Sequence, residues 1–105
     1  MRLLERRGER LIVHLPVELD HHCTEELRRE IDRILEKEPV SELEFDFSGT
    51  IFMDSAGVGM ILGRYKIMRA LDGRMLVSHM GAQIRRIMTL SGIQNHIPLE
   101  KEEAL

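Results

Sequence analysis

Short apolar runs at the start of the chain predict two strands. Arg2 to Arg7 is typical of a short edge strand, and it turns at Gly8-Glu9 into the apolar run Arg10 to Leu15. Pro16 follows and cannot donate a ladder hydrogen bond, so it marks the end of the second strand or its margin.

The apolar spacing then changes to that of a helix. Asp20 suits the N-cap position, Pro39 closes the segment, and the charged residues lie off the apolar stripe. The stripe consists of Cys23, Leu27, Ile31, Ile34 and Leu35. Strict alternation follows from Leu43 to Phe47, which predicts a strand with three apolar side chains on one face.

A turn at 48–50 and an apolar lead-in at 51–53 precede a second helix, expected from Asp54 or Ser55 to about Ala70. Two apolar stripes lie on roughly opposite sides of it, so one must face the sheet. The stripes are Val58, Ile61, Leu62 and Tyr65, and Ala56, Met60, Gly63 and Ile67. The other stripe packs on a neighbouring helix, or it stays partly exposed beside the polar Arg64 and Lys66 and binds a partner.

Three glycines in this segment, Gly57, Gly59 and Gly63, do not follow helix propensity. Away from a cap, each costs about 1 kcal/mol relative to Ala. We therefore expect something to approach the helix backbone closely, either the sheet below it or a partner above it.

The last third of the chain predicts another strand and helix. Arg74 to Met80 is typical of a strand, and a helix follows Gly81 and ends with Gly92 as its C-cap. The inner face of that helix carries Ile84, Ile87 and Met88. A short last strand is expected at Ile97 to Leu99, with a polar tail from Glu100 to Leu105.

The order ββαβαβα(β) predicts an α/β fold. Strands separated by helices imply right-handed crossovers, hence a mixed, mostly parallel sheet of four to five strands covered by helices. A chain of 105 residues forms one domain, 1–105. With 43% hydrophobic but only 4% aromatic residues, its core should be aliphatic.

Charge and cysteine content limit the possible partners and the cellular compartment of the protein. The net charge is -3, with basic residues scattered among acidic ones, which argues against nucleic acid as a partner. A single cysteine excludes an internal disulfide and fits a reducing cytoplasm. No signal peptide or membrane-spanning run is evident, so we expect a cytoplasmic protein that does not bind membranes.

The string Asp54-Ser55-Ala56-Gly57 is the strongest chemical signal, and its residues alone leave three interpretations open. Ser and Asp are favoured at helix starts, so a structural cap is sufficient. A phosphorylated serine would also suit a helix start, although Asp54 would repel its charge. A nucleophile is a weaker hypothesis, because the context is not Gly-x-Ser-x-Gly and no histidine is assignable as its base.

His14, His21, His22 and Cys23 could suggest a metal site. Zinc ligands, however, usually come as separated pairs, whereas His21 and His22 are adjacent and their side chains diverge. We therefore expect no metal and no cofactor, with His21 and His22 solvated in the first helical turn.

Several strings together resemble the STAS domain family, and within it the anti-sigma factor antagonists of spore-forming bacteria. The resemblance extends from about Leu11 to Ile97. It rests on Glu18-Leu19-Asp20-His21-His22, Phe52-Met53-Asp54-Ser55, Gly57-Val58-Gly59 and Leu62-Gly63-Arg64-Tyr65-Lys66. The Asp-Ser-x-Gly helix start is typical of the wider family, and the Asp-His-His and Gly-Arg-Tyr-Lys strings are typical of the sporulation branch.

The resemblance implies a switch protein rather than an enzyme. Members of the branch bind an anti-sigma factor that is also an ATP-dependent serine kinase, and so release a sigma factor. The kinase phosphorylates the serine that maps onto Ser55, and a PP2C-type phosphatase removes the phosphate. Asp20 would lie in the contact surface. The implied partner-binding set is Asp20, Asp54, Ala56, Gly57, Val58, Gly59, Met60 and Arg64.

This sequence departs from that branch in three places. Ala56 stands where relatives often have a second serine, which leaves Ser55 as the single acceptor in the motif. Pro16-Val17 replaces a glycine before Glu-Leu-Asp and would re-aim the loop that carries Asp20. The closing helix of the family is expected to be short or missing. The alternatives are a STAS scaffold module of a stress-sensing or transporter-associated type and, more remotely, an enzyme with Ser55 as nucleophile.

Overall fold

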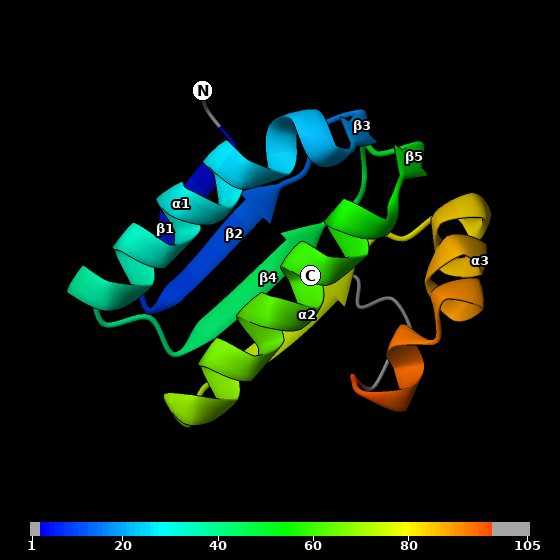
Figure 1. Cartoon of the computed structure of the whole chain (residues 1–105). Coiled ribbons are helices and arrows are strands. Elements are labelled where there is room, and N and C mark those ends of the chain that lie inside the picture. Colours follow the sequence, from blue (N-terminus) through cyan, green and yellow to red (C-terminus); the bar gives the residue numbers. More distant parts are fainter. Residues whose placement is uncertain (1–2, 98–105) are drawn as a thin grey trace.

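The computed structural model describes residues 3–97 of the 105-residue chain. Four strands form one mixed sheet in the order β1-β2-β4-β6 (Figure 1). β1 runs antiparallel to β2, whereas β2, β4 and β6 are parallel to one another. The strands are β1 (Leu4–Arg7), β2 (Arg10–His14), β4 (Glu42–Asp46) and β6 (Arg74–Ser78).

Two short strands that the sequence did not predict form a second, parallel pair. β3 (Glu18–Leu19) pairs with β5 (Phe52–Met53), so that Glu18 lies opposite Phe52 and Leu19 opposite Met53. This pair lies beyond the ends of β2 and β4, beside the start of the first helix (Figure 1). Runs of two residues carry too little periodicity to be recognised as strands.

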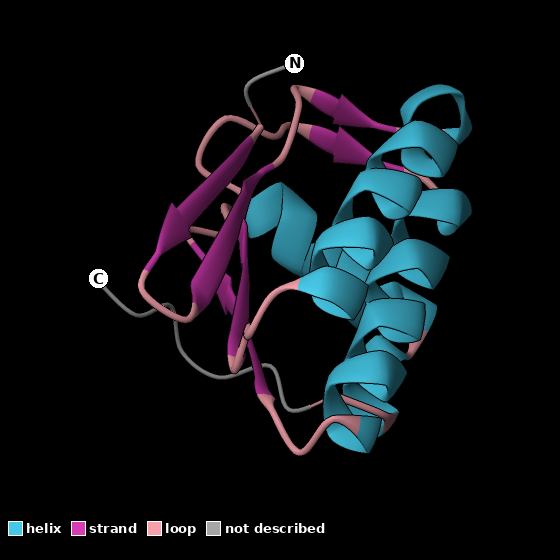
Figure 2. Cartoon of the chain, turned by 90° about the vertical axis from the view of Figure 1, so that its left-hand side faces the viewer, coloured by secondary structure: helices cyan, strands magenta, loops and turns pink. Residues whose placement is uncertain are grey.

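The two long helices, α1 (His21–Lys37) and α2 (Ser55–Ala70), cover one face of the main sheet (Figure 2). α3 (Ala82–Ser91) packs against β5 and α2, and a 3-10 turn, η1 (Ile93–Asn95), follows it. Gly92 ends α3 in the left-handed conformation with φ 79°, as the predicted C-cap requires. The α/β fold and its mixed, mostly parallel sheet are therefore confirmed.

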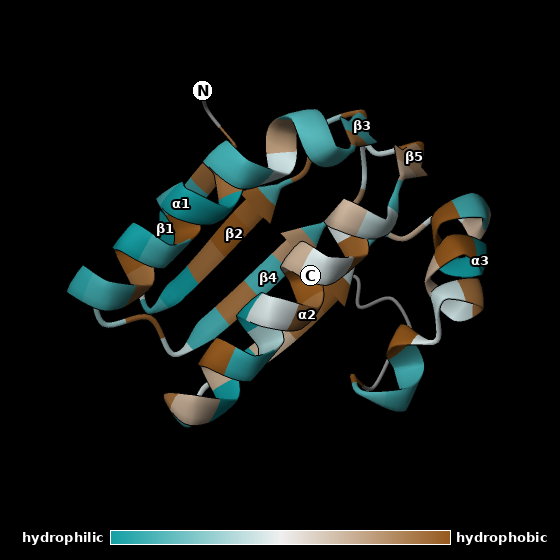
Figure 3. Ribbon diagram, viewed as in Figure 1, coloured by the Kyte–Doolittle hydropathy of each residue, from teal (hydrophilic) through white to brown (hydrophobic). Residues whose placement is uncertain are grey.

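The core lies between the sheet and α1 and α2. Its fully buried aliphatic and aromatic side chains come from both layers, and they include Leu11, Leu43, Phe45, Leu27, Ile31 and Ile61. Figure 3 shows the matching pattern on α1, whose hydrophobic residues turn toward the sheet and whose hydrophilic residues turn away. The predicted apolar stripe of this helix is thus its core face, although Cys23 and Ile34 are only partly buried.

The prediction for α2 was wrong about which residues share a face. Its buried face consists of Gly57, Met60, Ile61, Arg64 and Met68, which combines members of both predicted stripes. Arg64, expected beside an exposed apolar strip, is only 8% exposed. A hydropathy pattern cannot find such a face, because a glycine and an arginine are counted as non-core positions.

The predicted last strand at Ile97 to Leu99 is not observed where it can be judged. Ile97 is buried in a bend, and Pro98 and Leu99 lie outside the described residues. The polar tail and the closing helix also fall outside them. Within residues 3–97, no helix is both long and apolar enough to cross a membrane.

Candidate functional site

The helices α1 and α2 begin beside each other, and the Asp54 carboxylate joins the two starts. Asp54 Oδ1 accepts hydrogen bonds from the backbone N–H groups of Ala56 at 2.9 Å and Gly57 at 3.2 Å, as an N-cap does. Asp54 Oδ2 accepts from the backbone N–H of His21 at 3.0 Å and lies 3.3 Å from the Nδ1 of its ring. Asp20 caps α1 through a 3.0 Å bond from the His22 N–H.

Ser55 is the first residue of α2, and its side chain is exposed. Because Asp54 provides the cap, Ser55 has no capping role, and within residues 3–97 its hydroxyl makes no hydrogen bond. The cap interpretation therefore applies to Asp54 and not to Ser55. The Ser55 hydroxyl is free to meet another molecule.

The electrostatics of Asp54 match its contacts. Partial burial favours the neutral acid, but the N–H groups of Gly57, His21 and Ala56 together outweigh it and hold the pKa of the Asp54 carboxyl below its ordinary value. Asp54 is consequently ionised at neutral pH. Its Oδ1 also occupies the N–H groups of Ala56 and Gly57 at the start of α2, so a second anion at Ser55 would have to compete with Asp54 for them.

A groove of about 440 Å³ runs between α1 and α2 from this point. Gly59 and Gly63 line its α2 wall, and a Cβ atom at either position would meet nothing within 4 Å. The complete lining is Thr24, Glu25, Arg28, Ala56, Gly59, Met60, Gly63 and Arg64. These two glycines thus keep the groove open rather than bringing the sheet close.

Gly57 has a different role. A Cβ atom there would lie 2.7 Å from Met53 Cγ and 2.8 Å from the Leu19 carbonyl oxygen, closer than real contacts allow. The β3–β5 pair therefore packs directly on the first turn of α2. This is the close approach to the backbone that the glycine content predicted, and the neighbour is a pair of strands that the sequence did not reveal.

Arg64 closes the floor of the groove with an ion pair to α1. Its Nε lies 2.9 Å from Asp32 Oδ1, without the alignment of a good hydrogen bond, and its Nη1 donates to the Met60 carbonyl at 3.4 Å. Burial lowers the pKa of the Arg64 guanidinium, and Asp32 only partly offsets this effect. This ion pair links α2 to α1. Arg64 is buried there, whereas the sequence pattern placed it beside an exposed apolar strip.

The structure brings most of the predicted partner-binding residues to one end of the helical layer. Ser55 and Gly59 are exposed, Asp20, Asp54, Ala56 and Val58 are half-buried, and Gly57, Met60 and Arg64 are buried. Of the buried three, Met60 and Arg64 still line the groove. Gly57 contacts Leu19 and Met53 instead.

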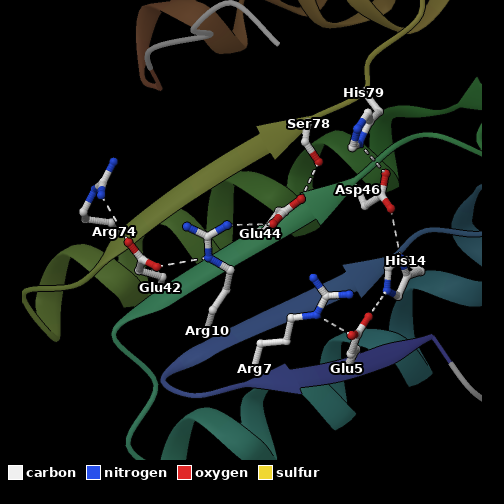
Figure 4. Close-up of polar contacts among 10 residues, drawn as sticks. All are labelled: Glu5, Arg7, Arg10, His14, Glu42, Glu44, Asp46, Arg74, Ser78 and His79. Atoms are coloured by element: carbon white, nitrogen blue, oxygen red, sulfur yellow. Dashed lines mark hydrogen bonds and ion pairs between the residues drawn. The ribbon is translucent and has the colours of Figure 1, made fainter. Parts of the chain in front are cut away.

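A second polar cluster, which the sequence did not predict, lies on the sheet face opposite α1 and α2 (Figure 4). Glu44 is only 2% exposed; Ser78 Oγ donates to it at 2.6 Å and Arg10 Nη1 at 3.2 Å. His14 lies between two carboxylates, 2.7 Å from Glu5 Oε1 and 2.9 Å from Asp46 Oδ2. The alternation of apolar and polar residues predicted β4, but it did not indicate that the polar side chains Glu44 and Asp46 are buried as well.

Charge compensation explains how these groups coexist. The hydrogen bond to Glu5 is the largest cause that raises the pKa of the His14 imidazole. Burial favours protonated Asp46, but hydrogen bonds from Ser48, His14 and His79 lower its pKa overall. Within residues 3–97, no three His, Cys, Asp or Glu side chains are arranged to hold a metal ion.

Comparison with known proteins identifies the class. The chain matches the STAS domain over residues 2–104, so it belongs to the STAS domain family. An anti-sigma F factor antagonist from Paenibacillus polymyxa is 33% identical over 93 residues, which cover 89% of this chain and 80% of that relative.

Two solved structures are similar to this chain in fold. SpoIIAA, an anti-sigma factor antagonist, in its unphosphorylated form shares 32% identity with a TM-score of 0.80, covering 88% of this chain and 81% of that one. The phosphorylated form of the Bacillus cell fate determinant SpoIIAA shares 32% identity with a TM-score of 0.73, covering 88% and 84%. The resemblance seen in the sequence is thereby confirmed.

Proposed function

We propose that this protein is an anti-sigma factor antagonist whose partner binding is switched off by phosphorylation of Ser55. Its partner is a serine-kinase anti-sigma factor in its ATP-bound form, and a PP2C-type phosphatase restores binding. The observation that carries the proposal is the free, exposed Ser55 hydroxyl at the start of α2, next to a carboxylate that already caps the helix. The relatives named anti-sigma F factor antagonists support the class of partner.

The contact surface consists of the starts of α1 and α2 and the groove between them. Asp20 and Asp54 supply negative charge there. Ser55 supplies an exposed hydroxyl, and Gly59 supplies exposed backbone. Ala56, Met60 and Arg64 line the groove, and Val58 lies beside them on α2. Gly57 acts indirectly, because its missing side chain lets β3 and β5 pack under the helix start.

Phosphate at Ser55 disfavours this complex for an electrostatic reason. A phosphoserine carries about -1.5 to -2 charges, and Asp54 already accepts from two N–H groups of the α2 start, those of Ala56 and Gly57. Residues 11–27 and 45–63 contain no Lys or Arg, and of the two arginines that line the adjacent groove, Arg64 is buried and paired with Asp32, whereas Arg28 is exposed on α1. Burying an uncompensated dianion in an interface costs several kcal/mol, and about 2.7 kcal/mol already lowers affinity a hundredfold.

No refolding is needed for such a switch. The chain matches the unphosphorylated and the phosphorylated SpoIIAA structures with TM-scores of 0.80 and 0.73, which supports one fold for both states. The switch then acts at the contact itself rather than through a change of fold.

The assignment is tested by phosphate transfer. The purified protein is incubated with the serine-kinase anti-sigma factor encoded in the same genome and with labelled ATP, and the modified residue is mapped by mass spectrometry. We expect one phosphate, on Ser55, and none on Ser55→Ala. Label on Ser55→Ala, or on another residue of the wild type, would contradict the assignment.

A further inference from the structure

Three exposed apolar side chains lie on the segments next to Ser55, the proposed phosphorylation site. None of them belongs to the partner-binding set that the sequence predicted. Val17 is 56% exposed, Ile51 60% and Phe52 43%. We call these three residues the apolar pad. Val17 precedes β3, and Ile51 and Phe52 lead through β5 directly into Asp54 and Ser55.

The backbone holds the pad together. The N–H groups of Ile51 and Phe52 both donate to the Val17 carbonyl, at 2.9 and 3.3 Å. Thr50 Oγ1 donates to the Pro16 carbonyl at 2.8 Å, which ties the same two loops once more. Since the pad is already ordered in the free protein, little conformational entropy remains to be lost when it is covered.

The clustering distinguishes the pad from ordinary surface residues. Among the residues that the structure describes, the other large exposed apolar side chains, Leu71 and Leu90, lie singly at the ends of α2 and α3. Isolated exposed leucines need no explanation, whereas three exposed apolar residues on two hydrogen-bonded segments are candidates for an interaction site. In Figure 1 the β3–β5 pair that carries the pad lies at the same end of the molecule as the starts of α1 and α2.

The surroundings of the pad are acidic. Glu18 is exposed and lies opposite Phe52 in the β3–β5 pair, and Asp20 follows it at the start of α1. The two segments that carry the pad, residues 11–27 and 45–63, contain no Lys or Arg. A surface of this kind is complementary to apolar side chains flanked by a cation.

We infer that the apolar pad and Glu18 extend the docking surface for the anti-sigma factor, which presents an apolar anchor to the pad and a Lys or Arg to Glu18. The inference rests on the proposed function, since it takes the same partner. Its support is the continuity of the pad with Ser55 and the charge complementarity described above. A cation paired with Glu18 is already neutralised, so it does not compensate a phosphate at Ser55.

The test compares the affinity of the unphosphorylated protein for the ATP-bound anti-sigma factor among matched variants, by titration calorimetry. Ile51→Ser combined with Phe52→Ser should weaken binding about tenfold or more, as loss of a buried anchor does. Leu90→Ser, at an even more exposed apolar position on α3, is the control and should bind as the wild type does. Ile51→Ser alone, in a loop and 60% exposed, serves if the double variant does not fold.

A second measurement addresses the charge. Glu18→Gln should lower the association rate and make it less sensitive to salt, because rim charges act mainly on encounter. Wild-type binding with no loss in the pad variants overturns the inference and leaves the proposed function intact. Absence of any wild-type binding overturns the proposed function itself. Self-association of the free protein that the pad variants abolish, with unchanged partner affinity, assigns the pad to a second copy and also overturns the inference.

Discussion

The Asp54 carboxylate should contribute more to the free energy of unfolding than an ordinary N-cap does, because it accepts hydrogen bonds from the starts of two helices. Asp54→Ala removes the cap of α2, made by bonds of 2.9 and 3.2 Å, and also the 3.0 Å bond to the His21 N–H at the start of α1. Loss of an N-cap costs typically about 1 kcal/mol. The bond to His21 adds about 1 kcal/mol after allowance for a side chain that is 27% exposed.

The expected loss in the free energy of unfolding is therefore about 2 kcal/mol, read from urea denaturation followed by circular dichroism. In a domain of this size, that corresponds to a decrease in Tm of roughly 10 °C. Asp54→Asn keeps one capping oxygen but loses the charge and the second acceptor, so its loss should be about half as large. A loss under about 0.5 kcal/mol for Asp54→Ala would refute the double role of this carboxylate.

The pH dependence gives an independent check. The folded-state pKa of Asp54 is lowered, so its contribution is complete above the unfolded-state value of about 3.9 and is lost as the pH falls through the folded-state value. The difference in stability between wild type and Asp54→Asn should consequently shrink as the pH falls below about 4. A difference that stays constant from neutral pH to strongly acidic pH would contradict this cause.

Three further predictions concern other parts of the fold. Gly57→Ala should destabilise the protein by about 1–3 kcal/mol through overpacking, whereas Gly59→Ala, with open space around it, should stabilise it by about 0.5–1 kcal/mol, both measured by urea denaturation. Asp32→Ala leaves the buried Arg64 unpaired and should cost about 3 kcal/mol, more than Arg64→Met in the same assay; the opposite order would contradict the ion-pair assignment. The raised pKa of His14 stabilises the fold fully below about pH 6.5 and less as the pH rises through the folded-state value, so the stability lost in His14→Gln should shrink toward alkaline pH in thermal melts.

The sequence predicted the long elements of the fold because each carries a periodic apolar pattern and a terminal signal. The helix from Ser55 to Ala70 and the left-handed C-cap at Gly92 were found in this way. β3 and β5 were missed, since two-residue strands have no period. What they do is visible only in the structure, where they pack on Gly57.

The candidate site was predictable in part. The motif located Ser55, but residue types alone could not decide whether Ser55 or Asp54 caps the helix; the hydrogen bonds to Ala56 and Gly57 decide for Asp54. The burial of Arg64 was missed because its ion pair with Asp32 depends on the packing of α1 on α2. Patterning assigns charged residues to the surface, and it has no means of finding a buried pair formed by two distant positions.

The central claim is that a phosphate on Ser55 prevents binding of the anti-sigma factor, and one comparison tests it most directly. The affinity of the ATP-bound anti-sigma factor is measured by titration calorimetry for the unphosphorylated protein and for the same protein phosphorylated on Ser55. The account predicts a loss of about a hundredfold or more on phosphorylation, from the cost of burying the dianion, with circular dichroism showing an unchanged fold. Equal affinities of the two forms would contradict it.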